Sequence, residues 1–145
     1  MKGTQLMTVN LKKITYGEAG WDVDANANFA ALNKDTGWIA LTLIAPATLG
    51  STGTTKPQIC CINGRVQMLG NLSVSLPRVP DVVNGVRIAT FPTEFAPTQG
   101  WVYGKLPITP TGGTVGFHVS GTGLYLHEAV SLSNVDLGQI TYLQA

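Results

Sequence analysis

From residue 37 onward, apolar and polar side chains alternate with a period of two, which is the pattern of half-buried β-strands. The clearest example is residues 65–74. The turn Asn63-Gly64 separates this run from the apolar stretch 58–62, and Asn-Gly between two strand-like runs is a strong hairpin signal because both turn positions favour positive φ. The sequence therefore predicts a β-hairpin with one face of its second strand in a core. The apolar positions of that strand are Val66, Met68, Leu72 and Val74.

A second hairpin is predicted from residues 114–120 and 123–128, joined by Gly121-Thr122. Glycine in the first position of a two-residue loop is typical of a type II′ turn. This turn sets the register, so His118 is expected opposite Tyr125, with His127 on the same face as Tyr125.

Further short strands are expected near residues 38–45, 86–91, 101–108, 129–133 and 140–143. Loops rich in glycine, proline and threonine separate them. Short strands at intervals of about ten residues are typical of β-sandwiches and barrels. The fold class is therefore all-β, with an antiparallel β-barrel or sandwich head over residues 37–145.

Residues 1–36 have a different pattern and are interpreted as an N-terminal linker or shoulder segment. A weak apolar stripe and acidic residues that could cap a helix predict a short helix over 22–33, beginning at Asp22 or Asp24. A frayed or extended segment is the alternative, because so short a helix is marginal alone. Trp21 and Trp38 flank this region and are expected to pack the segment against the head.

Composition excludes several classes of protein. The 145 residues carry a net charge of +1 and only 12% charged side chains, and the longest basic run is Lys12-Lys13. A nucleic-acid-binding protein would carry a basic stripe, so no nucleic-acid partner is expected. The longest apolar-rich segment, 38–49, is too short to cross a bilayer and is interrupted by Pro46, so we expect no membrane insertion.

The two cysteines, Cys60 and Cys61, are adjacent in a predicted strand. Neighbouring side chains of a strand point to opposite faces, so a disulfide between them is not expected, and both are interpreted as buried free thiols. Such thiols fit a chain folded in a reducing cytosol. The sequence lacks the cysteine and histidine spacing of a structural zinc site, and no cofactor is expected.

The sequence offers little support for catalysis. The eight acidic residues are scattered, whereas a glycosidase requires two facing carboxylates. Neither a Gly-x-Ser-x-Gly elbow nor a His-Glu-x-x-His motif occurs. We therefore expect a non-enzymatic protein.

The first candidate site for a ligand is the stretch Gln99-Gly-Trp101-Val-Tyr103. In a strand, Gln99, Trp101 and Tyr103 would share a face. Aromatic faces bind the apolar C–H groups of sugars, while planar polar groups bond to sugar hydroxyls, so this combination favours a saccharide ligand. The alternative is that both aromatic residues pack in the core or in a subunit interface.

The second candidate is the predicted hairpin face that carries His118, Tyr125 and His127, with Glu128 beside it. These side chains could also bond to a saccharide; a solvated face, or a ring of histidines near a threefold axis, is the alternative. Arg65 and Arg87 could bind phosphate or carboxylate, although exposed arginines are ordinary surface residues.

The order of short phrases along the chain resembles the head domains of siphophage receptor-binding proteins from phages of Gram-positive bacteria, including the lower baseplate proteins of lactococcal phages. Phe91 stands where leucine is usual and Ala96 where arginine is common, so ligand contacts are not copied from that family. The phrases are Asn10-Leu-Lys-Lys-Ile14, Tyr16-Gly-Glu-Ala-Gly-Trp-Asp22, Thr36-Gly-Trp38, Gly64-Arg-Val-Gln-Met-Leu-Gly70, Gly85-Val-Arg-Ile-Ala-Thr-Phe-Pro92, Phe95-Ala-Pro97, Gly121-Thr-Gly-Leu-Tyr-Leu126 and Val130-Ser-Leu132.

The resemblance implies a homotrimer of β heads at the phage tail tip or baseplate, whose N-terminal segments join other tail or baseplate proteins. It also implies attachment to host cell-surface saccharide, such as wall polysaccharide or a teichoic-acid-like polymer. No segment has the form of a signal peptide, so we expect assembly in the host cytoplasm and release with the virion. A structural virion protein (a head fibre, decoration or connector subunit) and a fragment of a polysaccharide depolymerase are the alternatives.

Overall fold

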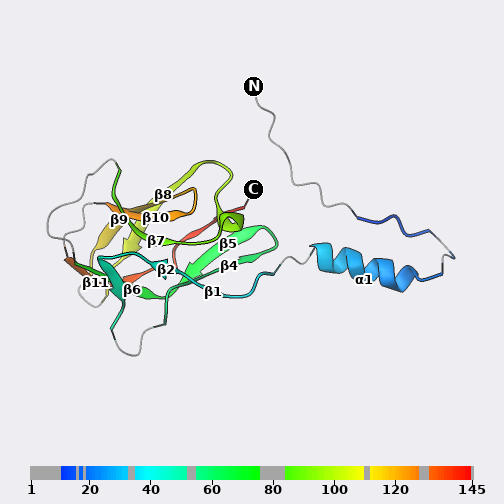
Figure 1. Ribbon diagram of the computed structural model, residues 1–145, viewed down its shortest axis with the longest axis horizontal. Helices are drawn as coiled ribbons and strands as arrows, with labels where there is room; N and C mark the ends of the chain where they lie inside the picture. Colours follow the sequence, from blue (N-terminus) through cyan, green and yellow to red (C-terminus); the bar gives the residue numbers. More distant parts are fainter. Residues whose placement is uncertain are drawn as a thin grey trace, which may run out of the picture.

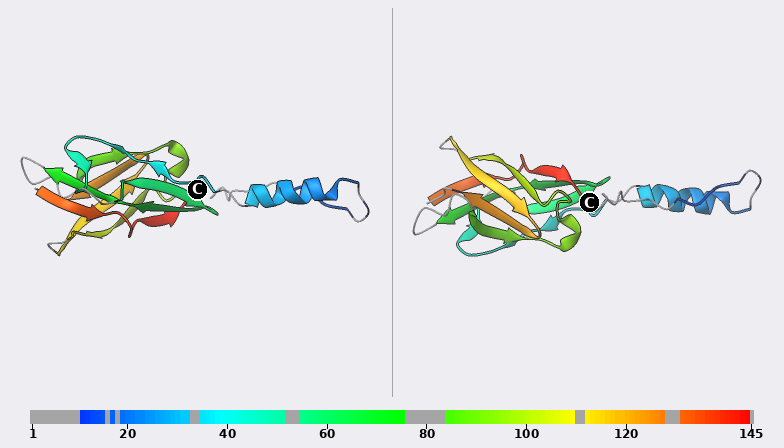
Figure 2. Two further views of the ribbon diagram at one scale, coloured as in Figure 1. Left: turned by 90° about the horizontal axis from the view of Figure 1, so that it is seen from below. Right: turned by 90° about the horizontal axis from the view of Figure 1, so that it is seen from above.

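The computed structural model describes residues 11–15, 17, 19–32, 35–51, 55–75, 84–109, 112–127 and 131–144. One helix precedes a series of short strands, and α1 stands apart from the strands at one end of the molecule (Figures 1 and 2). The elements are α1 (Trp21–Leu32), β1 (Ile39–Ala40), β2 (Thr42–Leu43), β3 (Ala47–Leu49), β4 (Gln58–Ile62), β5 (Arg65–Leu69), β6 (Asn71–Ser75), β7 (Val86–Thr90), η1 (Thr93–Phe95), β8 (Trp101–Pro107), β9 (Thr114–Ser120), β10 (Gly123–His127), β11 (Ser131–Asp136) and β12 (Thr141–Leu143).

The strands form three antiparallel sheets with the orders β1-β4-β5-β12, β2-β7-β10-β9-β8 and β11-β6-β3. Their inward faces meet in one apolar core, which includes Ile59, Leu72, Ile88, Phe95 and Leu124. The expected all-β fold class is therefore confirmed. Of the two architectures that the sequence left open, a closed barrel does not form among the described strands, and Figure 2 shows the sheets layered on one another.

Both hairpins are confirmed, the second with the expected register. Asn63 and Gly64 have φ values of 50° and 75°, so both central residues of the β4–β5 turn have the positive φ that the Asn-Gly pair favours. In the β9–β10 turn Gly121 has a φ of 52°, while Thr122 is not among the residues with positive φ, as a type II′ turn requires. The β9–β10 pairing places His118 opposite Tyr125.

The single strand expected over 38–45 is wrong, because the chain changes sheets within it. β1 pairs with β4, whereas β2 pairs with β7 in another sheet. Between them the Leu41 side chain is buried, and its N–H donates to the Pro57 carbonyl at 3.0 Å. A period-two pattern cannot reveal this change, because the residues on both sides of the junction keep their strand character.

The run 65–74 is likewise divided into β5 and β6, which lie in different sheets, and Gly70 forms the junction. Gly70 has a φ of 101°, and a Cβ there would lie 2.3 Å from the Lys56 carbonyl oxygen, so only glycine fits. The expected alternation is nevertheless confirmed, because all four apolar positions of the run are buried. These are Val66, Met68, Leu72 and Val74.

Strand boundaries differ in two other places. The predicted loop 46–57 contains β3, which pairs with β6. The strand expected over 129–133 is found as β11 and continues to Asp136. The predicted loop near Pro77 and Pro80 lies outside the described residues.

The helix is confirmed, but its expected cap is wrong. The N–H groups of Val23 and Asp24 donate to the carbonyl of Gly20 at 3.0 and 3.3 Å, so the helix begins one residue earlier than expected. Asp22 and Asp24 lie in the first turn, where a negative charge interacts favourably with the helix dipole.

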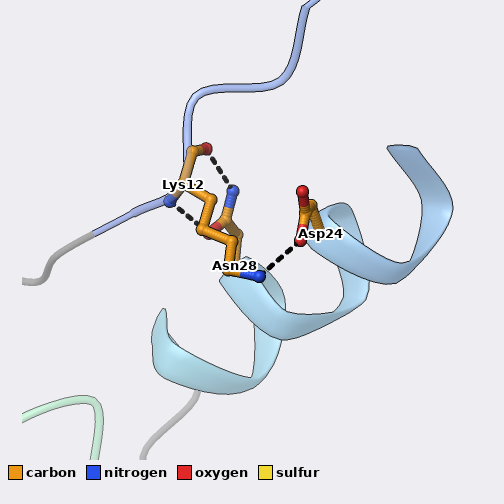
Figure 3. A network of polar contacts seen from close by, with 3 residues as sticks. All are labelled: Lys12, Asp24 and Asn28. Carbon is orange, nitrogen blue, oxygen red and sulfur yellow. Dashed lines mark hydrogen bonds and ion pairs between the residues drawn. The ribbon is translucent and has the colours of Figure 1, made fainter. Parts of the chain in front are cut away.

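Polar contacts attach the preceding segment to α1 (Figure 3). The Lys12 ammonium lies 2.7 Å from an Asp24 carboxylate oxygen. The Lys12 backbone N–H and C=O both bond to the Asn28 side chain at 2.9 Å.

Trp21 and Trp38 were expected to pack this region against the head, but their side chains are 59% and 45% exposed, so that prediction is wrong. The division of the chain at residue 36 remains a prediction.

Both cysteines are buried free thiols, as expected. The Cys61 thiol donates to Gln144 Oε1 at 3.1 Å. Burial, with smaller contributions from the nearby Asp35 carboxylate and Cys61 thiol, raises the pKa of the Cys60 thiol, so it stays protonated at neutral pH.

Candidate functional site

The outer face of the sheet β2-β7-β10-β9-β8 carries the candidate site. Strand register aligns Arg87 on β7 with Tyr125 on β10, Tyr125 with His118 on β9, and His118 with Tyr103 on β8. We call these four residues the cross-strand row. The opposite face of the same strands supplies core residues such as Leu124 and Phe117, so the row points away from the core.

Five rings on this face contact one another, and we call them the aromatic cluster: Trp101, Tyr103, His118, Tyr125 and His127. The His118 imidazole is central, because Trp101 and Tyr125 both stack on it with ring centroids at 4.4 Å. Trp101 also stacks on Tyr103 at 5.6 Å. Trp101 and Tyr103 are 46% and 64% exposed, so the cluster presents aromatic surface to solvent along the edge strand β8.

The burial of His118 differs from the sequence expectation. A hairpin face of this kind was expected to bring His118 to the ligand, yet the side chain is only 1% exposed. The strands on either side supply large rings, and these cover the imidazole. His118 therefore cannot offer its ring to a ligand unless its neighbours move.

A short contact joins the two histidines. Nδ1 of His118 lies 2.6 Å from Nε2 of His127, so one nitrogen donates a hydrogen and the other accepts it. Burial, with a smaller contribution from the neighbouring His127, lowers the pKa of His118. At neutral pH the buried imidazole of His118 is therefore uncharged.

Arg87 ends the row on β7. Its Nη2 donates to the Thr122 hydroxyl at 3.0 Å and to the Thr122 carbonyl at 3.3 Å, while its Nε is buried without a hydrogen-bond partner. Gly123 makes this arrangement possible, because a Cβ there would lie 2.6 Å from Tyr125 Cε2 and 2.8 Å from Arg87 Nε. The Tyr125 ring and the guanidinium thus occupy the space above Gly123.

Five of the six residues predicted to bind ligand lie together in the aromatic cluster. The sixth, Gln99, is exposed but lies in a turn before β8, and Gly100 with a φ of 81° separates it from Trp101. The shared strand face expected for Gln99 is therefore wrong. Arg65 is exposed on β5, in a different sheet from the row. Glu128 lies outside the described residues.

Sequence reasoning missed the packing of Arg87 and Tyr125 over Gly123. The pairing of β7 with β10 joins segments more than 30 residues apart, so no local turn signal announces it. Gly123 itself gave no hint, because it is the first residue of the predicted strand and directly follows the turn Gly121-Thr122.

This face has the groups that a ligand could contact. Exposed aromatic rings can bind apolar sugar faces, and the surrounding Arg87 and Lys105 can bond to hydroxyl or acidic groups. Among the described residues, no group of three or more His, Cys, Asp or Glu side chains could bind a metal ion. Within the same residues, no helix has both the length and the apolar character needed to cross a membrane.

Comparisons with known proteins add no assignment to these observations. No protein-family model matches the chain, and neither the curated proteins nor the solved structures give a significant match. The functional interpretation therefore depends on the geometry of the aromatic cluster and on the resemblance of the short phrases.

Proposed function

We propose that this protein is a phage tail receptor-binding protein that attaches to host cell-surface saccharide without catalysis. The observation that carries the proposal is the stack of Trp101, His118 and Tyr125, with Trp101 and Tyr103 exposed beside it. A saccharide would place its apolar ring face on the exposed part of Trp101 or Tyr103. Its hydroxyl groups would bond to the polar tips of the tyrosines and to His127.

A single shallow site of this kind binds weakly, so several copies would have to act together. We propose a homotrimer whose heads bind one polymer surface, because linked sites increase avidity by orders of magnitude without new contacts. The exposed apolar residues of the N-terminal segment supply contact surface for self-association and for other tail or baseplate proteins. These residues are Leu11, Ile14, Trp21, Val23 and Phe29. The proposed location is the tail tip or baseplate of the virion.

The direct test is binding of labelled protein to Gram-positive cells before and after chemical removal of the wall polysaccharide. The proposal predicts binding that disappears with the polysaccharide, while polymer length stays unchanged during incubation. Shortening of the polymer would indicate a depolymerase instead. Binding that survives complete removal of the polysaccharide would contradict the proposed ligand class.

A structural virion protein is the second candidate, and the exposed apolar surface of α1 favours it. Large apolar side chains such as Phe29, which is 68% exposed, are typical of assembly surfaces. That function predicts stable association with other virion proteins and no binding to cells of any strain.

A further inference from the structure

His118 lies where it can support the neighbouring aromatic rings but cannot contact a ligand directly. Its imidazole lies between Trp101 from β8 and Tyr125 from β10, and the Tyr125 plane is within 7° of its own. With 1% exposure, it touches the exposed rings but not the solvent that a ligand would displace. The orientation of Trp101 therefore depends on the ring beneath it.

We propose that His118 is a positioning residue, which holds Trp101 and Tyr125 stacked on either side of it, and that its hydrogen bond to His127 makes this arrangement sensitive to protonation. The inference rests on the proposed function in one respect, because the affinity it describes is affinity for saccharide. The arrangement of the rings can be measured without any ligand.

The proton dependence follows from the 2.6 Å contact between the two ring nitrogens. When both rings are neutral, one nitrogen donates and the other accepts. One added proton preserves the bond, because a charged imidazole can still donate to a neutral one. When both rings are charged, both facing nitrogens carry hydrogen and the contact must open.

The groups around His118 and His127 make protonation of both rings unfavourable. The titratable groups on this face are Tyr103 and Lys105 on β8, Tyr125 and His127 on β10, and Arg87 on β7 beyond Tyr125. The five strands of this sheet contain no Asp or Glu, so no carboxylate from them stabilises a charged imidazole. Charging both rings therefore requires acid below the ordinary histidine range; when it happens the contact opens, and movement of His118 disturbs the stack on both sides.

The chain contains two histidines and three tryptophans, which makes the test simple. The histidine Hε1 and tryptophan indole N–H signals would be followed by NMR from about pH 8 to about pH 4, through and below the ordinary histidine range. We expect His118 to titrate below the ordinary histidine value, and the Trp101 indole signal to shift with the same midpoint. Trp21 and Trp38 provide internal references, because they lie outside the aromatic cluster.

Two variants separate positioning from a general structural role. His118→Phe retains a flat ring between Trp101 and Tyr125 but accepts no proton, so the Trp101 signal should become independent of pH. His118→Ala removes the ring and should shift the Trp101 signal at every pH. If the Trp101 signal does not move in the wild type, or moves equally in His118→Phe, the inference is wrong.

The same variants can be tested against wall polysaccharide extracted from a strain that the protein binds. Wild-type Kd should rise by about three- to tenfold in acid, as expected for loss of one aromatic contact. In acid, His118→Phe should keep the affinity that it has at neutral pH, whereas His118→Ala should bind more weakly than the wild type at neutral pH. Absence of binding by every variant at every pH contradicts the proposed function, while the NMR result still decides the role of His118.

Discussion

The indole of Trp101 stacks on the imidazole of His118, with centroids 4.4 Å apart and planes inclined by 24°. This contact joins a side chain that is nearly half exposed to one that is almost completely buried. Because a large flat ring loses little conformational freedom when a ligand binds to it, a supported tryptophan is well suited to a shallow recognition surface.

Acid should destabilise the fold through His118. Its pKa is lowered in the folded protein, whereas the unfolded chain takes up a proton near the ordinary value of about 6.5. Between those two pKa values the unfolded chain holds more protons, so the free energy of unfolding decreases as pH falls through this window. Above it both states are neutral and the effect disappears. Urea denaturation at several pH values should show this decline, and His118→Phe should reduce it. An equal decline in both proteins would contradict the assignment to His118.

The absence of a side chain at Gly123 should be necessary for the site. Gly123→Ala places a methyl group against Tyr125 and Arg87, so we expect both to move and saccharide affinity to fall by about tenfold, or about 1.4 kcal/mol. Gly116→Ala on β9 is the matched control, because its methyl group would meet only His127 Cβ at an ordinary 3.5 Å. Titration of extracted polysaccharide would compare the variants. Equal affinities would show that the packing over Gly123 does not matter for binding.

Tyr142 should contribute to stability through a buried hydrogen bond. Its hydroxyl donates to the Phe95 carbonyl at 2.7 Å, and burial, with a smaller effect from Cys61, raises its pKa. Tyr142→Phe leaves that carbonyl without its partner and should cost about 1–3 kcal/mol of unfolding free energy. Tyr103→Phe removes a hydroxyl from a 64% exposed side chain and should change stability by less than about 0.5 kcal/mol. Denaturant unfolding measures both, and similar losses would contradict the argument from burial.

The sequence predicts the hairpins well, because Asn63-Gly64 and Gly121-Thr122 are local signals that determine both turn and register. It did not predict which sheet each strand joins. The junctions at Leu41 and Gly70 depend on contacts with Pro57 and Lys56, which are distant in the chain. For the same reason the sequence placed Trp101 with Tyr103, and His118 with Tyr125 and His127, but did not predict that the two groups form one cluster. Nor did it predict that His118 is buried, since its cover comes from two other strands.

Self-association should depend on α1. Three of its apolar side chains are exposed, Phe29 by 68%, and so short a helix is stabilised when such a face packs on a partner. Light scattering after size exclusion should give the mass of a trimer for the wild type and a smaller mass for Phe29→Glu. Leu143→Glu, at a similarly exposed position on β12, should leave the oligomer intact. A monomeric wild-type protein would contradict the proposed trimer.

The central claim is that saccharide binds at the aromatic cluster. The most direct measurement compares how labelled wild type, Trp101→Ala and Trp38→Ala bind to Gram-positive cells that retain their wall polysaccharide. Trp101 and Trp38 are 46% and 45% exposed, so the two substitutions remove similar exposed surface from different places. The account predicts that Trp101→Ala weakens binding by about tenfold or more, because loss at each head is multiplied by avidity, while Trp38→Ala binds like the wild type. Equal binding by all three proteins, with the oligomer intact, would contradict it.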